Sequence, residues 1–153
     1  MKRLISSDDG AAIVELALVA PFLILLTIGI IDIGRFARES ITIGNAARAG
    51  AEFGAYSSVN STNAPAIASA AQADATDVSL LPTDVFSTMY CSCGATPGTT
   101  VTACNPTPTC ASSDHLDSFV SVTVTKSFSS LINYPGIAST LTLTKTATQE
   151  ISP

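Results

Sequence analysis

The sequence predicts an α+β protein: a long N-terminal transmembrane helix continues into a small extracytoplasmic domain with a short second helix and a few antiparallel strands. Three patterns predict this architecture. Residues 11–31 are almost entirely apolar, small residues then recur with helical spacing to residue 56, and segments 119–125 and 141–144 alternate between apolar and polar residues. The first two patterns are typical of helices and the third of strands with one buried face.

The apolar run is long enough to cross a membrane. As a helix, residues 11–31 extend about 31 Å at about 1.5 Å per residue, which matches a hydrocarbon core of about 30 Å. The alternative is a helix buried in the core of a soluble protein. We expect a single-pass protein whose helix continues as an amphipathic segment over residues 32–56, followed by a small domain at residues 57–153.

The charge distribution excludes one large class of partners. Only 12% of the residues are charged, and the net charge is −5. Beyond Arg48 the only cationic side chains are Lys126 and Lys145, so the distal part of the chain is acidic. Nucleic-acid binding needs Lys and Arg clustered on one face, so we expect no nucleic-acid partner.

The four cysteines lie within residues 91–110, in a region rich in Ser, Thr, Pro and Gly that we expect to form a loop too irregular for a hairpin. Clustered, even-numbered cysteines favour disulfides and an oxidising compartment outside the cytoplasm. A bond between Cys91 and Cys93 would close a strained ring. Two pairings remain: Cys91–Cys104 with Cys93–Cys110, or Cys91–Cys110 with Cys93–Cys104. Zinc is the alternative, but the ligand spacing does not suit it and we expect no bound metal.

A polar-to-apolar junction precedes the apolar run. Residues 1–10 form a short polar leader that ends at Gly10, and Glu15 lies shortly after it. Here the sequence resembles type IV prepilins, in which a membrane-embedded peptidase cuts after a glycine and a glutamate is fifth in the mature chain. More narrowly, GAAIVELALVAPFLILLTIGIIDIGR resembles the opening of TadE-like proteins, the minor pilins or pseudopilins of tight-adherence pilus systems. The resemblance extends to about Gly54.

The resemblance implies a role in pilus assembly. Prepilin peptidase would cut between Gly10 and Ala11, and the further partners would be other pilins or pseudopilins and the inner-membrane assembly platform. Major pilins usually begin with an aromatic residue that becomes N-methylated, whereas Ala11 would begin this mature chain. This difference favours a scaffold or initiator role and leaves methylation open. The other hypothesis is an unprocessed, single-pass membrane-anchored binding or adhesion module.

Two residues inside the apolar run are candidates for assembly. A carboxylate is costly within a membrane, so Glu15 is a functional candidate by default. We expect it to pair with the α-amino group of Ala11 in a neighbouring chain; the alternatives are contact with lipid headgroups or protonation. Pro21 removes a helical hydrogen-bond donor. The resemblance implies unwinding there during extraction from the membrane, although a tolerated transmembrane proline fits equally well.

Beyond the apolar run, one side of the helix carries mostly small residues at intervals of three or four. These residues are Ile33, Ala37, Ile41, Gly44, Ala47 and Ala51. Small side chains let helices approach closely in membranes, so we predict a helix-packing surface. A pilin-type fold implies that the membrane-proximal half of this stripe faces outward and the distal half faces the protein's own domain.

The distal region contains signals for one more helix and a pair of strands. Pro65 suits the first turn of a helix, and the alanine-rich segment after it predicts a helix to about residue 76. The two alternating segments predict strands, and the turn signal at residues 134–136 predicts that they pair in an antiparallel manner. The core-facing residues of the first strand would be Val120, Val122 and Val124.

No pattern in the sequence indicates catalysis. His115 is the only histidine and lies between Asp114 and Asp117, but no serine is marked as a nucleophile beside it. An exposed histidine in an acidic turn accounts for this feature. We therefore expect no enzymatic activity and no cofactor. The expected location is the inner membrane, with the helix in contact with membrane lipid and the domain in the periplasm or outside the cell.

Overall fold

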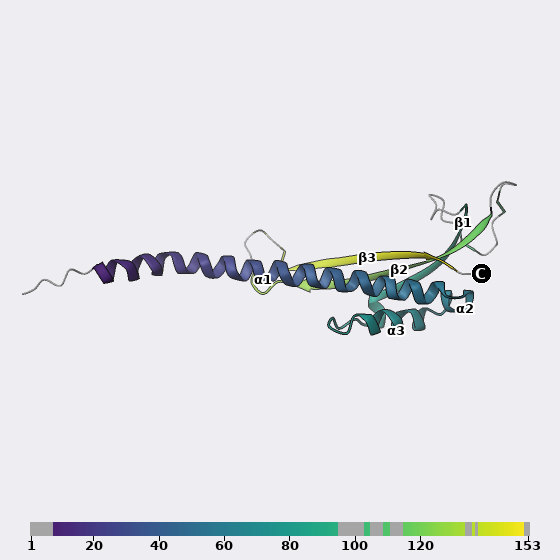
Figure 1. The fold of residues 1–153 in the computed structure, drawn as a ribbon, viewed down its shortest axis with the longest axis horizontal. Coiled ribbons are helices and arrows are strands. Elements are labelled where there is room, and N and C mark those ends of the chain that lie inside the picture. Colours follow the sequence, from purple (N-terminus) through teal and green to yellow (C-terminus); the bar gives the residue numbers. More distant parts are fainter. Residues whose placement is uncertain are drawn as a thin grey trace, which may run out of the picture.

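The computed structural model describes residues 8–94, 103–104, 109–110, 115–133, 136 and 138–151. Its elements, in chain order, are α1 (Asp8–Ala55), α2 (Ser58–Ser61), α3 (Ala64–Asp74), the 3-10 turn η1 (Pro82–Asp84), β1 (Val85–Cys93), β2 (Leu116–Ser129) and β3 (Thr140–Glu150). A long apolar helix followed by a small domain of a short helix and three antiparallel strands confirms the predicted α+β class (Figure 1).

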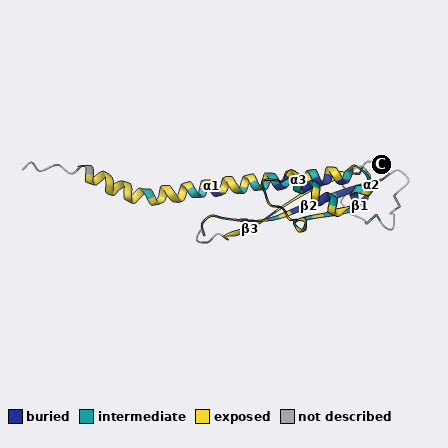
Figure 2. Cartoon of the chain, turned by 90° about the horizontal axis from the view of Figure 1, so that it is seen from below, coloured by how far each residue is buried: buried dark blue, intermediate teal, exposed yellow. Residues whose placement is uncertain are grey.

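α1 dominates the shape of the molecule. It has 48 residues and is therefore about 72 Å long at about 1.5 Å per residue. Its N-terminal part projects beyond the rest of the protein, whereas its C-terminal part lies along the sheet and α3 (Figure 1). Exposed residues cover the projecting part, and buried residues appear where the sheet and α3 reach the helix (Figure 2). We call residues 10–31 the proximal half and residues 32–55 the distal half of α1.

The domain has two layers, with α1 and α3 covering one face of the sheet. The strands are antiparallel in the order β1-β2-β3. Side chains from all the layers meet in one core. The largest fully buried residues are Ile43, Ile67, Val120, Val122 and Val124. The three central valines of β2 therefore face the core, as the alternating pattern predicted.

Two glycines let the helices approach the sheet closely. A Cβ atom added to Gly54 would lie 3.0 Å from Val120 and 3.2 Å from Ile67. A Cβ atom added to Gly50 would lie 3.2 Å from Val122. All three distances are short for carbon atoms in van der Waals contact, so glycine at these positions sets the spacing between α1, α3 and β2.

Two helices with capped N-termini, α2 and α3, lie between α1 and the sheet in the chain. The Ser57 side chain accepts a hydrogen bond from the main chain of Asn60 and caps α2. The Asn63 side chain caps α3 in the same way, and Pro65 lies in its first turn as predicted. α3 ends at Asp74, within two residues of the predicted end.

Both predicted strands are present and are longer than their sequence patterns. β2 extends the segment 119–125 in both directions, and β3 continues from the segment 141–144 to Glu150. The two pair antiparallel, with Val122 opposite Ala147, which confirms the predicted pairing. Gly136 has a positive φ of 83°, as expected within the turn signal, whereas residues 134 and 135 lie outside the described residues.

The prediction that the cysteine segment forms a loop from its start at Cys91 is wrong. Cys91 and Cys93 belong to β1, which pairs antiparallel with β2 and places Cys93 opposite Leu116. The segment therefore joins two paired strands, although most of it lies outside the described residues. Apolar residues occur on both faces of β1, with Phe86 67% exposed and Tyr90 stacked on Phe119, so the sequence lacks the alternation that marks a one-sided strand.

Candidate functional site

The candidate processing site lies at the free end of α1. The helix begins at Asp8 and continues without interruption through Gly10 and Ala11. Both of these residues are exposed, and a Cβ atom added to Gly10 would meet nothing within 4 Å. The bond between them is therefore on an open surface of the molecule. Residues 1–7 of the predicted leader lie outside the described residues.

Glu15 lies one helical turn beyond Ala11 and is also exposed. Among the described residues, no hydrogen bond or ion pair involves its carboxylate. Residues four apart on a helix lie on the same side, so Glu15 and the Ala11 backbone share one side of α1. The Glu15 carboxylate and the candidate processing site are thus next to each other at the apolar end of the helix.

The domain leaves nearly all of the proximal half of α1 uncovered. Leu18 and Phe22 are each 69% exposed, and Ile30 is 70% exposed. The helix is long and apolar enough to span a membrane, and only 6% of its most apolar stretch of 18 residues is buried. A core helix of a soluble protein would be mostly buried, so these side chains need an apolar environment from outside the molecule. Pro21 lies within α1 in this half.

Part of the predicted packing stripe is exposed, and part is buried in the core of the domain. Ile33, Ala37 and Ile41 are exposed, and Gly44 is partly exposed with only the Lys145 side chain near it. The two distal members, Ala47 and Ala51, are 1% and 0% exposed in the core. The last two members of the stripe thus pack against the domain, whereas its first three members are exposed.

A cluster that the sequence analysis missed joins α1 to the β2–β3 connection. The carboxylate of Asp32 is nearly buried and accepts hydrogen bonds from the main-chain N–H of Leu131 at 3.1 and 3.0 Å. It also accepts one from the Arg35 guanidinium at 3.0 Å. Three donor contacts therefore balance a buried negative charge, which would be costly without partners.

Two aromatic rings complete this cluster. Phe36 on α1 meets Phe128 on β2 edge to face, with 5.5 Å between ring centroids. The Arg35 guanidinium lies 5.3 Å from the centroid of Phe128. We call Asp32, Arg35, Phe36, Phe128 and Leu131 the junction. Asp32 is visible in the sequence as the first charge after the apolar run, but its partner Leu131 is 99 residues away and nothing local points to it.

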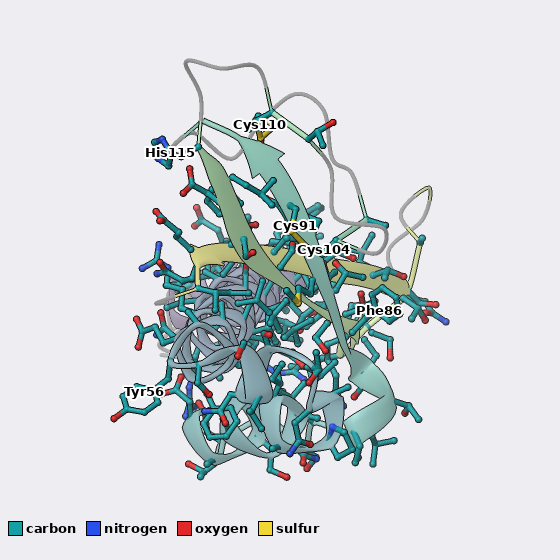
Figure 3. All side chains as sticks on the ribbon, turned by 90° about the vertical axis from the view of Figure 1, so that its right-hand side faces the viewer. Tyr56, Phe86, Cys91, Cys104, Cys110 and His115 are labelled. Atoms are coloured by element: carbon teal, nitrogen blue, oxygen red, sulfur yellow. A yellow bond between two sulfur atoms is a disulfide. The ribbon has the colours of Figure 1, made fainter. Side chains whose placement is uncertain are left out.

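β1, which carries Cys91 and Cys93, lies at the end of the molecule opposite to the start of α1 (Figure 1), and Cys91 and Cys104 lie next to each other in Figure 3. Cys91 bonds to Cys104, and Cys93 bonds to Cys110, which is the first of the two predicted pairings. Because all four sulfur atoms are in disulfides, none is a thiolate that could hold zinc.

His115 is exposed beside these disulfides, and its Nε2 atom lies 3.1 Å from Oδ2 of Asp117. Within the described residues, no hydroxyl group forms a hydrogen bond with the His115 ring. Asp114, the other predicted neighbour, lies outside them. The described groups thus provide a His–Asp pair without a nucleophile.

Comparison with known proteins finds a similarity over most of α1. The family model described as TadE-like protein matches residues 10–52. Neither the curated proteins nor the solved structures give a match to the chain. The matched range lies entirely within α1 and includes Gly10, Glu15 and the whole packing stripe. Residues 10–52 are therefore similar to TadE-like proteins, in line with the resemblance found in the sequence.

Proposed function

We propose that this protein is a processed minor pilin or pseudopilin of a tight-adherence pilus system. In this role α1 crosses the inner membrane, the domain lies outside the cytoplasm, and prepilin peptidase removes residues 1–10. The main support for this proposal is that the TadE-like match begins at Gly10. Gly10 lies near the start of a helix whose proximal half is almost entirely uncovered by the domain. The other pilins and the assembly platform are its proposed partners.

The surroundings of Gly10 support processing. A peptidase must reach the main chain on both sides of the bond that it cuts, and the surface at Gly10 is open. Cleavage would leave a positively charged amino group on Ala11, one turn from the carboxylate of Glu15. In a bundle of helices staggered along their axes, each Glu15 would meet the amino group of a neighbouring chain, so both charges would be neutralised within the membrane.

The first experiment measures the N-terminal mass of the protein purified from its own membranes, with and without prepilin peptidase. We expect a chain that begins at Ala11 only when the peptidase is present. Gly10→Leu should retain the leader, because the residue before the cut changes, whereas Gly34→Leu should be cut normally. Gly34 is the matched control, since a Cβ atom there also meets nothing within 4 Å. A leader retained with and without peptidase would favour the anchored binding module instead.

A second experiment separates processing from assembly. Glu15→Ala should be cut normally but recovered with the other pilins at roughly one tenth of the normal level or less. Without the carboxylate, the amino group of Ala11 in the neighbouring chain would be an unpaired charge in the membrane, which is costly. Glu52→Ala removes an exposed carboxylate from the distal half of the same helix and should assemble normally. Normal recovery of Glu15→Ala would contradict the pairing between Glu15 and Ala11.

A further inference from the structure

The β2–β3 connection meets α1 where the apolar run ends. Leu131 lies just after β2 and donates its main-chain N–H to both carboxylate oxygens of Asp32. Asp32 directly follows the apolar run of residues 11–31. The two residues therefore lie at the same level along the helix axis. If residues 11–31 span a bilayer, this end of the domain lies at the membrane surface.

The surface at this level is apolar and partly hollow. A groove of about 370 Å³ lies between the domain and α1, next to their contact at the junction. It is lined mainly by Gly29, Ile33, Phe36, Phe128, Ala138 and Leu141. Leu141 is 42% exposed, and Leu131 beside the groove is 57% exposed. Large apolar side chains are thus exposed on the domain itself as well as on the helix.

This groove is continuous with the apolar surface of the proximal half. A second hollow, lined by residues between Phe22 and Ile33, shares both Gly29 and Ile33 with the groove. Gly29 is within the apolar run and lies about 4.5 Å before Asp32 along the axis at about 1.5 Å per residue. Whatever covers the apolar run therefore also reaches the groove.

Beyond the groove, two arginines lie where the phosphate groups of a lipid leaflet would be. Arg35 and Arg38 lie about 4.5 and about 9 Å beyond Asp32 along the helix axis. Their side chains are 44% and 74% exposed. From the apolar run outward, the surface passes from apolar groove to exposed guanidinium groups, which matches the order of acyl chains and phosphates in a bilayer.

We propose that the β2–β3 end of the domain rests in the bilayer interface, with a phospholipid acyl chain in the groove and the lipid phosphate beside Arg35. The domain is then held against the membrane by Leu131 and Leu141 in addition to the spanning helix. The proposal rests on the membrane-spanning part of the proposed function and not on processing or pilus assembly.

Tryptophan fluorescence tests this contact, because the chain contains no tryptophan. The full-length protein is placed at one copy per phosphatidylcholine nanodisc, with or without bromine atoms on the acyl chains. The bromine atoms are near the headgroup end for the groove and distal variants and near the methyl end for the span variant. The two groove variants are Leu131→Trp, next to the lining residue Ser130, and Leu141→Trp, at a lining residue; the second variant serves if the first disturbs folding. Phe22→Trp reports on the span. Tyr56→Trp is the distal control, since Tyr56 is 81% exposed and about 36 Å beyond Asp32 along the axis.

Brominated lipid should lower the emission of both groove variants at least about twofold, as for a side chain in the interface, and leave Tyr56→Trp unchanged. Quenching of Phe22→Trp without quenching of either groove variant would overturn the lipid contact and leave the span intact. No quenching of Phe22→Trp would overturn the span and this inference together. Shielding of the groove variants only in discs with two or more copies would also overturn it, because a second chain would then fill the groove.

Discussion

The two halves of α1 belong to one continuous helix but have opposite surroundings. In the proximal half, large side chains such as Leu18, Phe22 and Ile30 are exposed. In the distal half, small residues such as Ala47 and Ala51 are buried against the domain. The hydrophobic effect favours burial at about 25 cal/mol per Å² of apolar surface. The distal half obtains this burial within the chain, whereas the proximal half can obtain it only from a bilayer or other helices.

The largest expected difference between the halves concerns stability. Ile67 is fully buried beside Gly50 and Gly54. Ile67→Ala should lower the free energy of unfolding of the domain by about 2–5 kcal/mol, because it leaves a cavity in a packed core. Ile30→Ala makes the same chemical change at a side chain that is 70% exposed and should leave this free energy unchanged. Urea unfolding of the full chain in detergent measures both.

Equal losses in the two variants would contradict the division of α1 into a spanning half and a domain-packing half. In that case the proximal half would have to pack on the domain in solution.

The elements that were predicted correctly carry strong local patterns. An apolar run followed by small residues at helical spacing marks α1 regardless of what covers it. The central valines mark β2 because they alternate with Ser and Thr and lie on the face of the strand that packs in the core. β1 was missed because both of its faces carry apolar residues, and because Cys91 and Cys93 suggested a loop.

The candidate site residues were chosen from the sequence on different grounds. Gly10, Glu15 and the cysteines are marked by residue type and spacing, and the structure reduced two disulfide pairings to one. The junction depends on residues far apart in the sequence, so local patterns contain no trace of it. The same holds for Gly50 and Gly54, whose importance follows from the side chains of Ile67 and β2 that approach them.

Two glycine substitutions in the distal half, with smaller and opposite effects on stability, test how closely this half packs on the domain. Gly54→Ala should destabilise the domain by about 1 kcal/mol, because the overpacking of Val120 and Ile67 outweighs the gain in helix propensity. Gly44→Ala should stabilise it by about 0.5–1 kcal/mol, since the nearest atom to its added Cβ is on the flexible Lys145 side chain at 3.9 Å. Stabilisation by both substitutions, in the same urea assay, would show that α1 does not lie tightly on β2.

The smallest expected effect concerns a surface ion pair near the boundary between the halves. Arg38 on α1 lies 3.0 Å from Asp77, in the connection after α3, and the two side chains are 74% and 35% exposed. Solvent screens such a pair strongly, so Arg38→Ala should cost less than about 1 kcal/mol, and the loss should shrink further as salt rises. Arg48→Ala is the control, because Arg48 is exposed on the same helix and forms no ion pair among the described residues. A loss of several kcal/mol for Arg38→Ala in uncharged detergent would mean that this pair, rather than the apolar core, holds α3 against α1. The distal half would then depend on a charge contact at its edge, and the contrast between the two halves would no longer be one of apolar packing alone.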